Sequence, residues 1–325
     1  MPRVAALPFF GSLLVLVALS FVVALAWGSV PLSPRLVIAT LFGGGDEFSR
    51  TVVLELRLPR ALAAFATGGL LALAGALMQV LLRNPLADPY ILGVSGGAAV
   101  FALGAIMLGL GGLWIGAGAF AGALTSTFAV FALAHGRGGW TPTRLLLTGV
   151  VVAAGWGAVI SLMLALGSDG SLRSMLFWLM GDLSHATLPT GGLAVLALGI
   201  ALAMPFARSL NILARGELQA GALGVAVRPL NIGLYVVASL LTASAVTMAG
   251  AIGFVGLVVP HMLRLVTGTD HRRLLPGAVL LGGALLITAD TLARSVLAPQ
   301  QLPVGVVTAL IGVPLFLYLL HRARQ

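Results

Sequence analysis

Residues 58–99 read LPRALAAFATGGLLALAGALMQVLLRNPLADPYILGVSGGAA, and this stretch decides the fold. It has a proline at the start of a helix, continues as an apolar helix rich in small residues, and breaks at a polar loop with two prolines. A turn rich in glycine and serine then leads into a second apolar segment. Because glycine and alanine let membrane helices approach closely, this pattern is typical of helices packed tightly within a bilayer.

The composition of the whole chain excludes a soluble protein. Hydrophobic residues make up 59% of the chain and charged residues 8%, and the mean hydropathy is +1.10. Apolar runs of about 17–25 residues predict membrane spans, and only helices can satisfy the backbone hydrogen bonds of such runs in lipid. We therefore predict an all-α polytopic membrane protein, with one transmembrane domain over residues 1–325. The ten predicted spans are residues 8–30, 59–82, 91–108, 113–135, 144–166, 189–206, 231–249, 252–266, 276–297 and 303–320.

Two residue types are absent from the chain, and each absence excludes a chemistry. There is no cysteine, which excludes disulfides and thiolate metal sites. All 18 basic residues are arginine, and a P-loop requires a lysine, so the chain cannot hydrolyse ATP by that route. If the protein pumps a substrate, another subunit supplies the energy.

The charge distribution predicts the orientation in the membrane. With the N-terminus inside, the inner segments hold twelve arginines and three acids, and the outer segments hold six of each, so the whole net charge of +9 lies inside. This is the positive-inside bias, and it places both termini in the cytoplasm. The inner arginines are scattered and have no stacking aromatics between them, which argues against a nucleic-acid partner. The N-terminal apolar run is too long for a signal peptide, so we expect an uncleaved first helix.

The longest inner connection, residues 208–228, has a structure of its own. Its leucines and alanines predict two short helices joined at Gly216 and ended by Gly224. Glu217 lies near the start of the second helix, where an acidic side chain suits the helix dipole. The segment is either a plain connection or a docking element for a cytoplasmic partner.

Three arginines lie at the outer mouth of the predicted bundle. Arg57 and Arg60 flank the Leu58-Pro59 pair at the start of the second span, and Arg294 lies at the outer end of the ninth. We expect these side chains to be exposed, either as interfacial anchors or as charges that speed the docking of a partner.

Three stretches of the chain resemble one family. Residues 58–99 resemble the first signature of the iron-chelate/cobalamin family of ABC importer permeases. Residues 249–278, AGAIGFVGLVVPHMLRLVTGTDHRRLLPGA, resemble its second signature, and ADTLARSV followed by QQLPVGVVTALIGVPLF resembles its C-terminal pattern. Gln301 stands where an acid is common in that family.

The resemblance implies a fold, partners and roles for particular residues. It implies the type II importer permease fold in the bacterial inner membrane, and a homodimer whose pathway lies between the two copies. It also implies two ABC ATPase subunits that bind ATP and Mg, and a periplasmic binding protein. The chain itself needs no cofactor, and the cargo is a bulky metal chelate such as cobalamin, a ferric siderophore or haem. The implied site residues are Gly216, Glu217, Ala220, Leu223 and Gly224 for ATPase coupling, Arg57, Arg60 and Arg294 for binding-protein docking, Pro142 and Thr143 for the inner gate, and Trp156, Ser161, Met163, Val304, Val307 and Leu310 for the pathway.

Two other functions are alternatives to the permease hypothesis. Gly93-Val94-Ser95-Gly96 matches the nucleophile motif of rhomboid intramembrane serine proteases, with His261 as a possible base. Both residues are predicted near the inner face, whereas rhomboids cut near the outer face. An ion-coupled secondary transporter would hold ionisable residues at membrane depth, but Asp290 lies toward the outer end, one turn before Arg294. The histidines do not have the spacing of a metal site.

Overall fold

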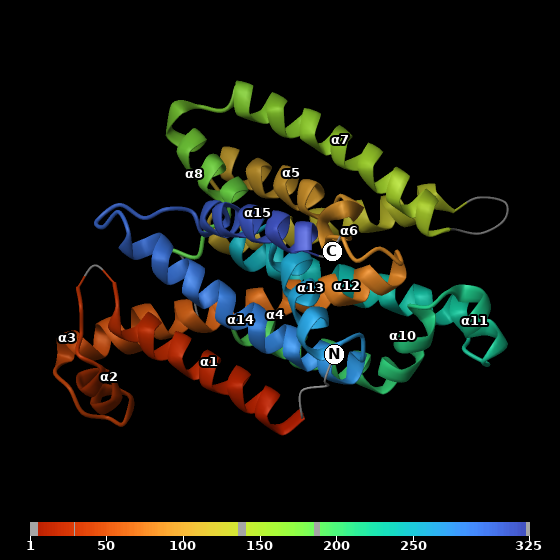
Figure 1. Cartoon of the computed structure of the whole chain (residues 1–325). Helices are drawn as coiled ribbons and strands as arrows, with labels where there is room; N and C mark the ends of the chain where they lie inside the picture. The colour runs from red at the N-terminus through yellow and green to blue at the C-terminus, as the bar shows by residue number, and fades with distance from the viewer. Residues whose placement is uncertain (1–5, 29, 136–140, 185–188, 323–325) are drawn as a thin grey trace.

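The computed structural model describes residues 6–28, 30–135, 141–184 and 189–322, which form a bundle of helices joined by short loops (Figure 1). Arg3, Arg137, His185 and Arg324 lie outside the described residues. Ten helices make up the body of the described bundle: α1 (Ala6–Ala26), α4 (Leu58–Leu81), α5 (Val94–Met107), α6 (Gly112–Ala134), α7 (Pro142–Leu166), α9 (Thr190–Ala203), α12 (Val227–Ala249), α13 (Val255–Thr267), α14 (His271–Ser295) and α15 (Val304–Arg322).

Shorter helices lie at the two ends of the bundle. One end carries α10 (Ala207–Leu213) and α11 (Glu217–Ala222), and we call it the inner end, following the orientation that the sequence predicts. Four other short helices lie at the opposite, outer end (Figure 1). Two 3₁₀ turns, η2 (Pro89–Leu92) and η3 (Met204–Phe206), complete the described elements. The outer short helices are α2 (Pro34–Leu41), α3 (Glu47–Arg50), the π-helix η1 (Thr51–Arg57) and α8 (Asp169–Met180).

The all-α membrane-spanning class is confirmed. Among the described residues, seven helices are long and apolar enough to cross a membrane, and three shorter apolar helices are Val94–Met107, Val255–Thr267 and Val304–Leu319. Each predicted span overlaps one of these ten helices, and the predicted short eighth span is α13, which contains Pro260. The sequence did not predict α8, which lies in the outer connection after α7.

Helix α4 is the central element, and almost every residue from Ala61 to Leu81 is buried. It packs against α9, α12, α13 and α14 (Figure 1). Close packing of this kind depends on glycine, because there is no space for a side chain where two backbones touch. A Cβ atom at Gly75 would overlap the carbonyl oxygen of Gly256 in α13, and one at Gly68 would overlap that of Gly282 in α14. The small-residue pattern of α4 therefore sets the distances between the core helices.

Helix α7 lies at the edge of the bundle, on the side opposite α1 (Figure 1). Leu145 and Gly149 are its buried residues, and a Cβ atom at Gly149 would overlap the carbonyl oxygen of Ile91. A Cβ atom at Gly155 or Gly157 would meet no atom within 4 Å. Most of α7 thus presents an apolar surface that the single chain leaves uncovered.

Candidate functional site

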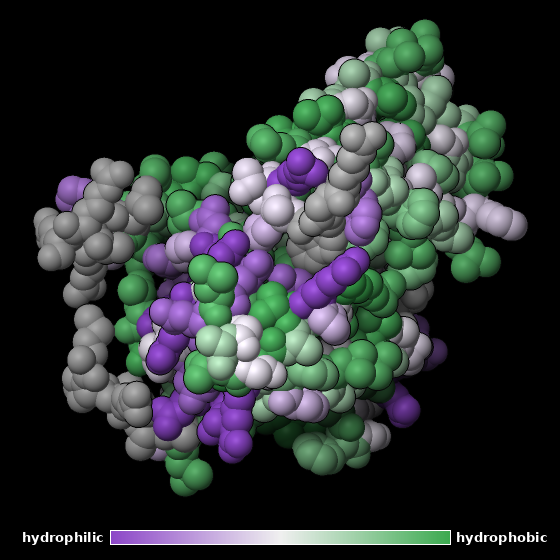
Figure 2. Space-filling model, turned by 90° about the vertical axis from the view of Figure 1, so that its right-hand side faces the viewer, coloured by the Kyte–Doolittle hydropathy of each residue, from purple (hydrophilic) through white to green (hydrophobic). Residues whose placement is uncertain are grey.

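The inner connection forms the two short helices that the sequence predicts. Gly216 joins α10 to α11 with φ +133°, and Gly224 follows α11 with φ +81°. These backbone conformations favour glycine, which explains why the two helices end where they do. Figure 2 faces the inner end of the bundle, and hydrophilic residues gather on it.

Of the residues that the resemblance implies for ATPase coupling, Leu223 is exposed and Ala220 is not. Ala220 is completely buried against the bundle, whereas Leu218 is 92% and Leu223 69% exposed. An arginine at position 220 would therefore disrupt the packing of α11 on its own chain, and would not probe a partner's groove. The sequence analysis did not identify Leu218 as an exposed apolar residue of this connection, although its place directly after Glu217 in an inner loop pointed to it.

Polar side chains fix both short helices to the bundle. Asn231 of α12 donates a hydrogen bond to Glu217 at 3.2 Å, and Arg83, after α4, lies 3.8 Å from the same carboxylate. Asn211 of α10 donates to Asp270 at 2.8 Å and accepts from the backbone N–H of His271 at 2.8 Å. The two short helices are thus attached to α12 and to the start of α14.

Asp270 also caps α14, because its carboxylate accepts a hydrogen bond from the backbone N–H of Arg272. The hydrogen bond from Asn211 is the largest cause that lowers the pKa of Asp270 below its ordinary value. The charged carboxylate therefore stabilises the folded chain above the ordinary pKa of aspartate, and this contribution is lost as the pH falls through the lowered pKa.

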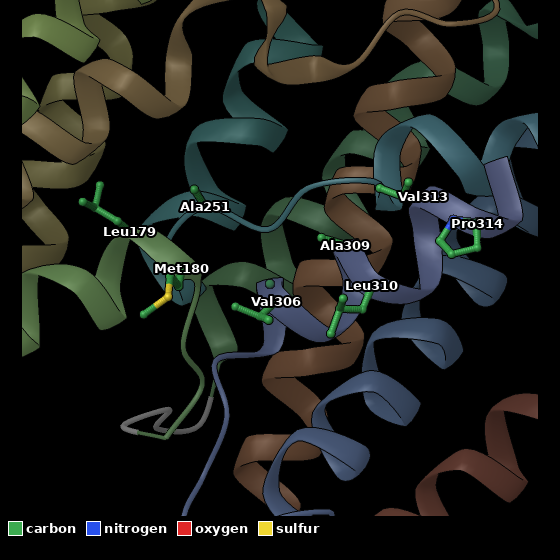
Figure 3. A pocket seen from close by; sticks show the side chains of 9 residues that line it. Leu179, Met180, Ala251, Val306, Ala309, Leu310, Val313 and Pro314 are labelled. Carbon is green, nitrogen blue, oxygen red and sulfur yellow. The ribbon is translucent and has the colours of Figure 1, made fainter. Parts of the chain in front are cut away.

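An open apolar groove of about 540 Å³ lies beside α15. Figure 3 shows that its lining comes from three segments: the end of α8, the loop after α12, and one face of α15. Within the described residues the lining has no ionisable side chain. The lining residues are Leu179, Met180, Ala251, Gly305, Val306, Ala309, Leu310, Val313 and Pro314.

Glycines build the wall of this groove. A Cβ atom at Gly305 of α15 would overlap the carbonyl oxygen of Met180, and one at Gly250 would overlap that of Trp178. Gly181 and Gly250 have φ values of +78° and +68°. Backbone therefore meets backbone where α8, the loop after α12 and α15 join at the groove.

The six predicted pathway residues do not share one surface in this arrangement. Leu310 lines the groove, and Ser161 is exposed on α7. Val304 and Val307 are buried against the bundle. These two valines lie on the face of α15 that packs inward, so they line no open surface in this arrangement, and their assignment to the pathway stays a prediction.

Trp156 and Met163 point from α7 toward α5. The indole N–H of Trp156 donates to the Ser126 hydroxyl at 2.9 Å, and that hydroxyl donates to the carbonyl of Gly93 at 2.8 Å. The methyl carbon of Met163 lies 3.8 Å from a Cβ atom built at Gly104 of α5. Trp156 is thus an anchor of α7 and not part of its open face.

The predicted inner gate lies at the first turn of α7. Thr141 caps this helix by accepting a hydrogen bond from the backbone N–H of Arg144 at 3.3 Å. Pro142 and Thr143 follow the cap, and Thr143 is exposed. The gating role of both residues stays a prediction.

The outer arginines are not exposed as expected, since Arg57 is 7% and Arg294 8% exposed. Arg57 donates to the carbonyl oxygens of Leu25 and Ala26 at 2.7 and 3.1 Å, and Arg294 donates to that of Ala24. The last carbonyls of a helix have no partner within it, so two guanidinium groups satisfy the end of α1. The expectation of exposure is wrong for these two arginines, and their docking role stays a prediction.

Arg60 forms a charge cluster with residues of α14. Its guanidinium makes a two-pronged contact with the Asp290 carboxylate, with a closest distance of 2.9 Å. It also donates to the Gln301 side chain at 2.8 Å, and Arg294 approaches Asp290 to 3.9 Å. Changing Arg57 and Arg60 together to glutamate would therefore break contacts inside the chain, and would not test docking alone.

Ser95 and His261 do not form a catalytic pair. Ser95 lies in the first turn of α5, whereas the His261 ring packs edge-on against Phe316 of α15, with ring centroids 6.1 Å apart. In the described part of the chain, no hydrogen bond joins the two side chains. The geometry that nucleophilic catalysis needs is not present here.

Comparisons with known proteins agree on one family. A sequence model of the FecCD transport family matches residues 15–322. The chain is 46% identical to the cobalamin import system permease protein BtuC of Halobacterium salinarum, over 89% of this chain and 79% of that protein. It is 43% identical to the hemin transport system permease protein HmuU of Yersinia pestis, over 84% of each chain.

A solved structure supports the same assignment. It shows an inward-facing conformation of a metal-chelate type ABC transporter, with a TM-score of 0.86 and 30% identity, over 97% of this chain and 98% of that one. These similarities fit the permease hypothesis, and they fit neither a secondary transporter nor an intramembrane protease. The chain is a multi-pass membrane protein that belongs to the FecCD transport family.

Proposed function

We propose that this chain is the permease subunit of an ABC importer that moves a bulky metal chelate into the cell. The observation that carries the proposal is the pair of short helices at the inner end, α10 and α11, which we take to be a docking element. It exposes Leu218 and Leu223 while Glu217 and Asn211 tie it to the bundle. A chain without lysine has no P-loop of its own. A separate ATPase would therefore bind this element and move it when ATP is hydrolysed. The relatives named as permeases for cobalamin and hemin support the cargo class.

The complete transporter would contain two copies of this chain. The uncovered face of α7 and the open side of the groove support this, because a pathway for a bulky ligand needs walls on all sides. Two ATPase subunits, which bind ATP and Mg, would lie against the inner end, and a binding protein would deliver cargo at the outer end. The positive-inside bias supports a cytoplasmic membrane with both termini inside.

The chemistry of the groove suits passage and not storage of the cargo. Its lining offers apolar contacts and no fixed charge within the described residues. Cobalamin, ferric siderophores and haem are bulky, and a surface without strong polar partners would release them readily. Closure of the ATPases would pull on α10 and α11, and the contacts of Asn211 and Glu217 would pass that movement to α14 and α12.

Leu218→Arg tests the docking assignment. The added charge would have to enter the partner's apolar contact region, so we expect the affinity for the ATPase to fall about tenfold or more. The measurement is copurification of the cognate ATPase with tagged permease. Phe42→Arg is the matched control, because Phe42 is also an exposed apolar residue but lies at the outer end. If the Leu218 variant keeps the ATPase and its coupled activity, the docking assignment is wrong.

A further inference from the structure

The face of α15 that points away from the groove holds an unusual contact. A Cβ atom at Gly312 would lie 2.6 Å from the Cβ and 2.7 Å from the Cγ of Phe254. Real side chains do not approach this closely, so the Phe254 side chain occupies the place where a side chain of residue 312 would lie. Gly312 is therefore a seat for Phe254, which precedes α13.

Phe254 holds this position with a backbone conformation that its side chain disfavours. Its φ is +70° and its ψ is −26°. A bulky residue adopts left-handed backbone only where its surroundings impose it, and such residues are common where proteins move or bind ligands. Two residues before it, the backbone N–H of Ile252 donates to the Tyr90 hydroxyl at 3.0 Å, which fixes the loop on one side. The seat on Gly312 fixes it on the other.

The same turn of α15 is the place where that helix deforms most easily. Pro314 has no N–H for the carbonyl of Leu310, and glycine at position 312 weakens the helix further. Leu310, Val313 and Pro314 line the groove (Figure 3). The same easily deformed turn of α15 thus contacts Phe254 on one face and lines the groove on the other.

A small apolar cavity lies next to the seat. Its volume is about 20 Å³, and Phe254, Val258, Leu285, Ala289, Thr308 and Gly312 are among the residues that line it. The Thr308 hydroxyl bonds to the carbonyl of Gly305 in its own helix, so the cavity offers little to a water molecule. This apolar cavity beside the ring leaves space for α15 to shift relative to α13.

We propose that Phe254 is a latch for α15. Seated on Gly312, it holds the groove wall in the arrangement seen here, and α15 leaves the seat when the groove opens to the other side of the membrane. When the seat empties, Phe254 loses the contact that holds its left-handed backbone. This inference rests on the proposed function, because only a transporter has to expose the groove to each side in turn.

A reversible cross-link tests the latch. The natural chain has no cysteine, so Phe254→Cys with Gly312→Cys provides the only two thiols. Their Cβ atoms would be close enough for a disulfide after a small shift. The complex with its cognate ATPase is placed in liposomes, and copper–phenanthroline cross-linking is timed without nucleotide and after trapping with ATP and vanadate. We expect the two rates to differ by about tenfold or more.

Transport is the second readout. With ATP and the cognate binding protein added, uptake of cyanocobalamin and of haemin is measured before cross-linking, after it, and after reduction with dithiothreitol. The cross-linked protein should lose at least about nine-tenths of its uptake, since α15 cannot leave the seat, and reduction should restore it. The control pair is Gly116→Cys with Thr247→Cys, which joins α6 to α12 at an ordinary contact of 3.6 Å. Its cross-linking rate should be the same in both states.

The outcomes separate the latch from the proposed function. Equal cross-linking rates, or undiminished uptake by the cross-linked protein, in a complex whose natural form transports would overturn the latch alone. Failure of the natural complex to take up either compound in the presence of ATP and its binding protein would count against the proposed function. Gly312→Ala should also lower both the melting temperature and the uptake, and adding Phe254→Ala should restore the melting temperature. A Gly312→Ala defect that Phe254→Ala does not relieve would contradict the seat.

Discussion

Gly75→Val should prevent the protein from folding, with a loss of more than about 4 kcal/mol. A Cβ atom at this position would overlap the backbone carbonyl of Gly256. A backbone group cannot turn aside as a flexible side chain can, so α4 and α13 would have to separate. Because α4 is buried along most of its length, that separation would disturb most of the bundle. The measurement is the yield of monodisperse protein in detergent, followed by thermal unfolding.

Gly155→Val is the control for this prediction. The chemical change is the same and the position is also within a long apolar helix, but a Cβ atom at Gly155 would meet no atom within 4 Å. We expect this variant to fold with a melting temperature close to that of the natural protein. A Gly75 variant that melts normally would show that α4 does not pack on α13 as described.

Asp290→Ala should destabilise the protein by about 3–5 kcal/mol. Asp290 is buried between Arg60 and Arg294, at 2.9 and 3.9 Å. Removing the carboxylate would leave two guanidinium groups with excess positive charge at the outer end of α4 and α14. Burying an unpaired charge costs far more than a surface ion pair contributes. Denaturant titration in detergent, followed by tryptophan fluorescence, measures the loss.

Gln301→Ala is the matched control at the same cluster. It removes a neutral and exposed partner of Arg60 and leaves the ion pair with Asp290 in place. We expect a change of less than about 1 kcal/mol. Equal effects of the two substitutions would mean that the cluster is solvated, and that its arginines are free to contact a partner as first predicted.

Hydropathy alone located the ten main helices, because a span in lipid needs a continuous apolar run. Hydropathy did not locate α8, because α8 is not a continuous apolar run of that length. That helix has twelve residues and contains Asp169 and Arg173, so it does not resemble a span. Only the structure shows that the end of α8 forms one wall of the groove, since Leu179 and Met180 meet α15 through contacts that are distant in the sequence.

The faces of individual helices were harder to predict than the helices themselves. Helix α11 has six residues, which is less than two turns, so periodicity cannot distinguish the face of Ala220 from that of Leu218. Arg57 and Arg294 were predicted to be exposed because they lie near helix ends. Their actual partners are the carbonyls at the end of α1, which are 270 residues from Arg294 in the sequence.

The central claim is that this chain forms the path of an ATP-driven importer whose energy comes from a separate subunit. The most direct test is uptake of cyanocobalamin and haemin into liposomes that contain the purified permease with its ATPase and binding protein. We expect uptake only when all three proteins and ATP are present, and no ATP hydrolysis by the permease alone. ATP hydrolysis by the isolated chain, or uptake driven by a proton gradient without the ATPase, would contradict the claim.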